Sequence, residues 1–150
     1  MPRRTVDTPV GPLTLTEEHD AITGVTWKGR EVDDTPLLAE AARQVAAYFA
    51  GTRETFDLPL HVAGSALQRS VCDAMLAIPF GETRTYGDLA RDLGASAQAI
   101  GQACGGNPIP VIIPCHRILG ASGLGGFSGG TGIETKVALL KHEGAASLLL

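Results

Sequence analysis

The residues best suited to chemistry lie in the run Pro114-Cys115-His116-Arg117. A cysteine attacks as its thiolate, and a neighbouring histidine or the start of a helix can lower the pKa of the thiol. The apolar, β-branched run before it, residues 109–113, predicts a short buried extended segment that ends in a sharp turn at Pro114. This setting favours a nucleophilic thiol over the commoner role of a free cysteine as a small core residue. Adjacency alone leaves open whether His116 faces the sulfur.

Length and composition indicate a globular chain. Its 150 residues are enough for one domain or for two small domains that share an interface. No apolar run is long enough to span a membrane, and no signal-peptide core follows the first residues. We therefore expect a cytoplasmic protein without a membrane partner. Three cysteines at unrelated spacings predict reduced thiols rather than a disulfide framework.

The charges are unevenly distributed along the chain. The formal net charge is −4, and residues 1–57 hold six Lys/Arg against ten Asp/Glu, whereas residues 58–150 hold six against six. Phosphate contacts usually come from a basic surface. Any nucleic-acid surface is therefore expected in the second part, with few cationic contacts.

The first part, residues 1–63, is predicted to be a structural α/β domain. Alternating apolar and polar residues over 4–27 predict a small antiparallel sheet. Residues 36–50 have helical spacing, with Thr35 as N-cap and Gly51 as the stop. Residues 56–62 are predicted to form a further strand.

The second part, residues 64–150, is predicted to be mainly helical. Ser65 can cap a helix that runs to about residue 77, Thr85 can cap a helix over 86–93, and a Gly-containing turn leads to a helix over 97–103. Helix, short turn and helix form the helix-turn-helix pattern. The last of these helices consists almost entirely of small residues, which suits close packing against a neighbouring helix or entry into a minor groove. Residues 120–132 are rich in glycine and predict a loop, and residues 131–143 predict a closing helix.

Taken together, these segments resemble the O6-alkylguanine-DNA alkyltransferase family. The resemblance lies in ordered segments across nearly the whole chain: residues 48–51, 56–60, 78–86, 107–117, 125–130 and 139–144. It implies an α/β N-terminal subdomain, with a small antiparallel sheet and a helix, packed on a mainly α C-terminal domain that contains a helix-turn-helix. It also implies direct-reversal DNA repair, in which an alkyl group moves irreversibly from O6 of guanine to Cys115 and the protein is consumed.

The resemblance assigns a catalytic role to five residues. Cys115 accepts the alkyl group, His116 takes the thiol proton through a water, and Glu143 orients the imidazole. Asn107 holds the turn, while Tyr86 crowds the target phosphate and donates a proton or hydrogen bond to the leaving guanine. The alternatives are a solvated carboxylate for Glu143 and a half-buried helix tyrosine for Tyr86.

The implied partner is double-stranded DNA, bound through the minor groove without sequence preference by a protein expected to be a monomer. The family usually has an arginine where this chain has Gln98, and a tyrosine where it has Phe127. Arg117 is expected to tie the nucleophile's turn to its surroundings, and the glycine-rich loop is expected to be either a pocket wall or a flexible surface loop. The residues expected at the DNA or the base are Arg84, Thr85, Ala97, Gln98, Ala99, Gly101, Arg117, Ile118, Phe127, Ser128 and Gly129.

Other functions are compatible with parts of the sequence. Because Gln98 replaces the family's arginine, a lesion-binding protein without transfer activity stays an alternative, although such relatives lack the active cysteine. A second alternative is an alkyl acceptor that works on single strands or small molecules. A thiol protease or a zinc site is weakly supported, since no paired-cysteine spacing occurs and no cysteine precedes Cys72. We expect no metal and no cofactor.

Overall fold

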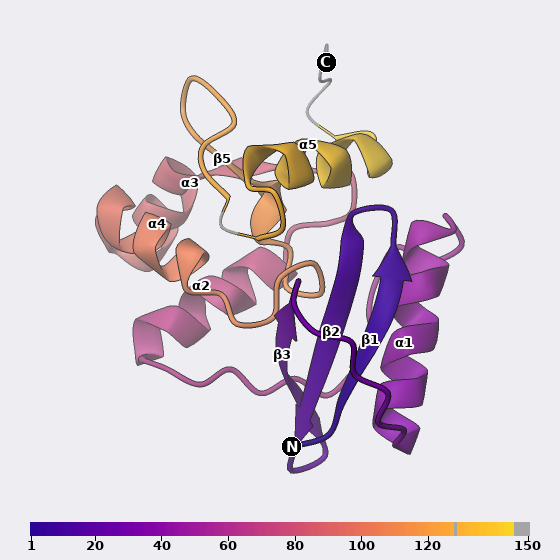
Figure 1. Cartoon of the computed structure of the whole chain (residues 1–150). Coiled ribbons are helices and arrows are strands. Elements are labelled where there is room, and N and C mark those ends of the chain that lie inside the picture. The colour runs from indigo at the N-terminus through magenta and orange to yellow at the C-terminus, as the bar shows by residue number, and fades with distance from the viewer. Residues whose placement is uncertain (128, 146–150) are drawn as a thin grey trace.

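The computed structural model describes residues 1–127 and 129–145. Its N-terminal half is a three-stranded antiparallel sheet in the order β1-β2-β3, formed by Arg3–Thr8, Gly11–Glu18 and Ala21–Thr26 (Figure 1). A two-residue turn joins β2 to β3, with His19 and Asp20 both in the left-handed region at φ 50° and 63°, as the twist of a tight hairpin requires. The predicted sheet is confirmed.

Helix α1, Pro36–Phe49, packs along β1 and β2 (Figure 1). The Thr35 hydroxyl accepts a hydrogen bond from the Leu38 amide at 3.0 Å, and Pro36 occupies the first turn, where a missing amide proton is harmless. Leu38, Val45 and Tyr48 lie on its buried face. The helix predicted over 36–50 therefore forms, within one residue of its predicted end.

The strand predicted over residues 56–62 is wrong. Only one bridge forms, between Leu60 and Ile22, with the Ile22 amide donating to the Pro59 carbonyl and the His61 amide donating to the Ile22 carbonyl. Pro59 has no amide proton to extend the ladder, so the segment crosses β3 at a single point.

The second half begins with three helices, α2 (Ala66–Leu76), α3 (Tyr86–Leu93) and α4 (Ala97–Gly105), which pack on one another (Figure 1). Thr85 and Asp88 form a reciprocal capping box at the start of α3, and Gly94 ends that helix at φ 65°. Ser96 caps α4 through a bond from the Ala99 amide at 3.1 Å. The predicted helix-turn-helix is present.

The buried extended segment predicted over residues 109–113 is also wrong in conformation, although these residues are buried as expected except at Pro110. The chain folds into a tight loop in which the Ile113 amide donates to the Ile109 carbonyl at 2.8 Å and Val111 takes φ 73°. The Asn107 side chain closes this loop: its Nδ2 donates to the Ile113 carbonyl at 2.9 Å, and its Oδ1 accepts from the Ile109 backbone amide at 3.0 Å. The prolines at 108, 110 and 114 supply no donors for a strand, so the loop depends on this side chain.

After the loop, a single 3-10 turn, η1 (Cys115–Arg117), leads into β5 (Ile118–Leu119), which pairs in parallel with β4 (Arg84–Thr85). A glycine-rich loop then precedes α5, Ile133–His142, two residues later than its predicted start. One cluster of buried apolar side chains extends from the sheet and α1 through α2 to α5. No helix among the described residues is long and apolar enough to cross a membrane.

Candidate active site

Cys115 is the first residue of η1, and the turn is anchored by its amide, which donates to the Ile113 carbonyl at 2.8 Å. The side chain is half-buried, unlike those of Cys72 and Cys104, which are buried. Burial raises the pKa of the Cys115 thiol, and the hydrogen bond with the Asn107 side chain opposes this only in part. The thiol is therefore protonated at neutral pH and needs a base before it can attack.

The candidate base is His116, the next residue in the chain. The His116 ring is fully buried, and its Nε2 is 2.8 Å from Glu143 Oε2. Burial lowers the pKa of His116 although the Glu143 carboxylate acts in the opposite direction, and the imidazole therefore stays neutral. Burial alone would raise the pKa of Glu143, but hydrogen bonds from His116, Arg117 and Tyr48 hold it well below its usual range. A neutral ring that donates from Nε2 to a carboxylate carries its lone pair on Nδ1.

His116 Nδ1 has no hydrogen-bond partner among the described residues, although it is buried. Such an atom is rare in a folded protein because the lost hydration is costly. Because His116 directly follows Cys115 in the chain, this free acceptor is a candidate for the group that takes the thiol proton, directly or through one water.

The Glu143 carboxylate is shared by four donors. Arg117 Nε lies 2.9 Å from Oε1, while Arg117 Nη2 at 2.9 Å, His116 Nε2 at 2.8 Å and Tyr48 Oη at 2.6 Å all reach Oε2. Arg117 also donates to the Ile78 carbonyl at 2.6 Å. The carboxylate is thus fully engaged and fixed in place.

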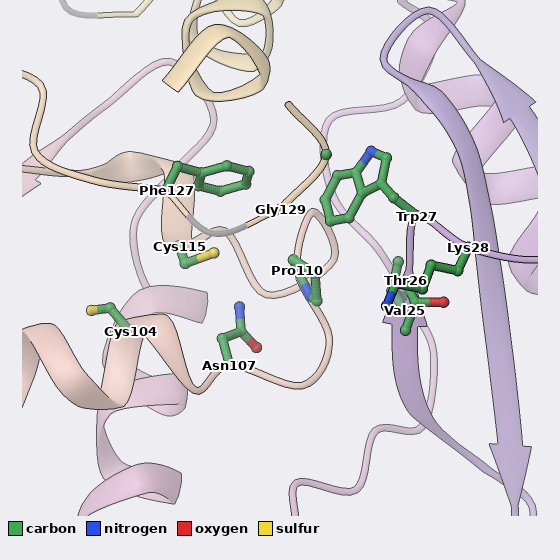
Figure 2. Close-up of a pocket in the computed structure, with 11 residues that line it drawn as sticks. Val25, Thr26, Trp27, Lys28, Cys104, Asn107, Pro110, Cys115, Phe127 and Gly129 are labelled. Carbon is green, nitrogen blue, oxygen red and sulfur yellow. The ribbon is translucent and has the colours of Figure 1, made fainter. Parts of the chain in front are cut away.

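Two cavities meet at Cys115. One, of about 400 Å³, is lined by residues of the helix-turn-helix and of the glycine-rich loop: Tyr86, Gly101, Cys104, Gly105, Gly126 and Phe127. The other, of about 420 Å³, reaches the edge of the N-terminal sheet at Trp27 and Lys28 and also includes Asn107, Pro110 and Gly129. In Figure 2 the thiol points into the space between Phe127 and Asn107, with the Trp27 indole opposite. Both volumes are in the range of small-ligand sites.

Two glycines of the loop are needed for these walls to meet. A Cβ at Gly125 would lie 2.9 Å from the Tyr86 ring, and a Cβ at Gly129 would lie 2.4 Å from the Trp27 ring. Any larger residue would have to displace an aromatic wall of the site.

The outer face of α4 is formed by small or neutral side chains. Ala97 and Gln98 are exposed, and Gly101 is half-buried with open space where a side chain would start. The nearby cation Arg84 is paired with Asp92 at 2.6 Å, and the Thr85 hydroxyl accepts a bond from the Asp88 amide at 3.1 Å.

The structure thus brings Cys115, His116, Glu143 and Asn107 together and places Tyr86, Phe127 and Gly129 on cavity walls. It places other candidates differently. Arg117 is buried in the Glu143 cluster, so a contact with DNA would require it to leave this ion pair. Ile118 is buried, and its carbonyl accepts a bond from Lys136 at 2.6 Å. Ala99 is half-buried on α4, and Ser128 lies outside the described residues.

Three side chains around the site did not follow from the sequence: Tyr48, Trp27 and Lys136. Lys136 is fully buried, with Nζ bonded to the Ile118 and Gly126 carbonyls at 2.6 and 3.2 Å, and burial lowers its pKa. A signal for it existed, because Lys136 lies four residues before Leu140, on the apolar face of α5. Tyr48 and Trp27 come from the N-terminal half, and only tertiary packing brings them here.

The fold and the site together define a helix-turn-helix protein with a cysteine on a cavity wall, followed in the chain by a buried histidine that is hydrogen-bonded to a carboxylate. The chain belongs to the 6-O-methylguanine DNA methyltransferase family: residues 1–62 match the model of its ribonuclease-like domain, and residues 66–145 match that of its DNA-binding domain.

Relatives in several organisms share most of the chain. It is 44% identical to the methylated-DNA–protein-cysteine methyltransferase of Mycobacterium tuberculosis, over 93% of this chain and 90% of that protein. It is 42% identical to the constitutive methylated-DNA–protein-cysteine methyltransferase of Bacillus subtilis, over 93% of each. The crystal structure of the M. tuberculosis protein in complex with DNA superimposes with a TM-score of 0.83 at 42% identity, covering 96% of this chain and 93% of that one.

Proposed function

We propose that the chain repairs O6-alkylguanine in double-stranded DNA by transferring the alkyl group irreversibly to Cys115, so that each molecule acts once. The observation that carries this proposal is the Cys115 thiol on the wall of two cavities, followed in the chain by a buried histidine whose Nδ1 has no hydrogen-bond partner among the described residues. Family membership supplies the reaction, and the geometry supports these residues as the ones that perform it.

The step balances without a cofactor. His116 accepts the thiol proton through a water, and the sulfur electron pair forms a bond to the alkyl carbon while the bond from that carbon to O6 breaks. The electron pair of that bond stays on O6, and the guanine gains a proton. Thiol plus alkylguanine gives thioether plus guanine, with no net gain or loss of protons.

In this proposal Tyr86 assists the leaving group. Its ring lines the smaller cavity, and burial together with the nearby thiols raises the pKa of its hydroxyl, which therefore remains a donor. A stacked base must leave the duplex to reach Cys115. The small residues on the outer face of α4 support docking in the minor groove, where the backbone can approach closely.

In this proposal residues 64–150 form the DNA-binding and alkyl-accepting domain, and residues 1–63 form a structural domain. The protein acts as a monomer in the cytoplasm. No group of three or more His, Cys, Asp or Glu side chains that could hold a metal ion occurs in the described part of the chain.

Intact-protein mass spectrometry tests the function. After incubation with excess duplex containing O6-methylguanine, the protein is expected to gain one methyl group in place of one proton, and Cys115→Ala is expected to gain none. Tight binding of the duplex without a mass gain would replace the proposal with lesion binding. A gain only from single-stranded DNA or the free base would show a competent thiol without base flipping.

Gln98 is the residue on which the lesion-binding alternative rests. Gln98→Arg adds a cation to an exposed position of α4, so duplex affinity is expected to rise by about threefold to tenfold, with a salt dependence steeper by about one counterion. Fluorescence anisotropy at several salt concentrations measures both.

Gln102→Arg is the matched control, because Gln102 is exposed one turn later on the same helix. If residue 98 stabilises the duplex from which the guanine has been flipped out, only Gln98→Arg also raises the single-turnover repair rate. Equal repair rates for the two variants would mean that the added positive charge alone causes the gain.

A further inference from the structure

Tyr48 links the N-terminal half to the active site. It lies in α1, 95 residues before Glu143, and its hydroxyl donates to Glu143 Oε2 at 2.6 Å. The side chain is 1% exposed, so the bond is shielded from water. Burial and the neighbouring carboxylate raise the pKa of Tyr48 far above its ordinary value, which keeps the hydroxyl protonated and donating.

Packing fixes the direction of this hydroxyl. The Tyr48 ring lies against His142, with centroids 4.8 Å apart, and against Phe56 at 5.4 Å and Phe80 at 6.1 Å. The Tyr48 carbonyl and His142 Nε2 are 2.8 Å apart, within hydrogen-bond distance. His142, the last residue of α5, therefore holds the backbone of Tyr48, and Glu143, which follows it, holds the Tyr48 side chain.

We propose that Tyr48 is a positioning residue for alkyl transfer, whose hydroxyl fixes the Glu143 carboxylate against His116 so that the N-terminal half completes the active site. This inference rests on the proposed function. It revises the purely structural role of residues 1–63, since one of their side chains acts on the reaction through Glu143.

Tyr48 has a second effect because it shares Oε2 with His116. A donor on this oxygen withdraws negative charge from the side that faces the imidazole, so the imidazolium is stabilised less and His116 remains neutral to lower pH. The other titratable groups around the pair are Cys115 and Arg117 from η1, and Lys136 and His142 from α5. All four of these groups remain in the protein when only the Tyr48 hydroxyl is deleted.

Tyr48→Phe keeps the ring and removes the hydroxyl. Single-turnover methyl transfer from duplex DNA is expected to slow by roughly threefold to twentyfold at neutral pH, and the acid limb of the rate profile is expected to move to higher pH. The limb moves upward because the rate needs neutral His116, and the variant raises the pKa of that ring. Titration of the His116 ring by NMR measures the same shift without the reaction.

Phe56→Leu is the control for packing, since Phe56 contacts the Tyr48 ring and has no part in the Glu143 hydrogen bonds. It is expected to lower the melting temperature while leaving the acid limb in place. Should Tyr48→Phe fold poorly, 3-fluorotyrosine incorporated at position 48 keeps ring and hydroxyl, donates more strongly, and is expected to move the limb to lower pH.

An unchanged rate and an unchanged acid limb in Tyr48→Phe would overturn the inference. This result is distinct from failure of the proposed function, in which the wild-type protein itself would gain no methyl group.

Discussion

Glu143→Gln is expected to slow alkyl transfer by about a hundredfold to a thousandfold and to lower the free energy of unfolding by about 3–5 kcal/mol. The rate falls because an amide stabilises the imidazolium far less than a carboxylate does, and assistance by a positioned base is worth about 10²–10⁴ in rate. Stability falls because the buried Arg117 guanidinium loses its counter-charge, and removing one partner of a buried pair costs about this much.

Single-turnover kinetics and urea unfolding measure the two effects. Glu134→Gln is the matched control, since Glu134 is exposed in the first turn of the same helix, and both quantities should stay close to wild type. The double variant Glu143→Gln with Arg117→Met removes both charges and should recover much of the stability but none of the rate. A single variant that keeps full stability and rate would show that Glu143 supports neither.

The elements that were correctly predicted are those encoded by neighbouring residues. Helix α3 begins and ends where the sequence predicts because Thr85, Asp88 and Gly94 satisfy its end groups locally. Helix α1 follows from Thr35, Pro36 and a regular apolar face in the same way. Such signals need no knowledge of the rest of the fold.

The two wrong conformations depend on distant partners and on missing donors. A strand at residues 56–62 requires an edge to pair with, and Pro59 limits its pairing to Ile22. The loop over 109–113 is stabilised by the Asn107 side chain, which a β-branched composition does not reveal. In the candidate site, Asn107, Cys115 and His116 lie close together in the sequence. Tyr48 reaches Glu143 only because the end of α1 lies against the end of α5.

Gly101→Leu separates the stability of helix α4 from its capacity to dock. A Cβ at Gly101 would meet no atom within 4 Å, so the fold should tolerate the leucine, and replacing a helical glycine should stabilise the helix by about 0.5–1 kcal/mol. Leucine would nevertheless hold the backbone of α4 away from a minor groove and narrow the cavity that Gly101 lines beside Cys115.

Repair of duplex DNA by Gly101→Leu is therefore expected to fall by on the order of a hundredfold, or about 2.8 kcal/mol, with an unchanged or higher melting temperature. Anisotropy with duplex DNA and single-turnover kinetics measure the loss. Ala46→Leu places the same side chain on an exposed position of α1, on the other side of the molecule from α4 (Figure 1), and should leave binding and repair intact. Full duplex affinity in Gly101→Leu would mean that another surface carries the DNA, because a helix packed into the groove has no space for four additional carbons.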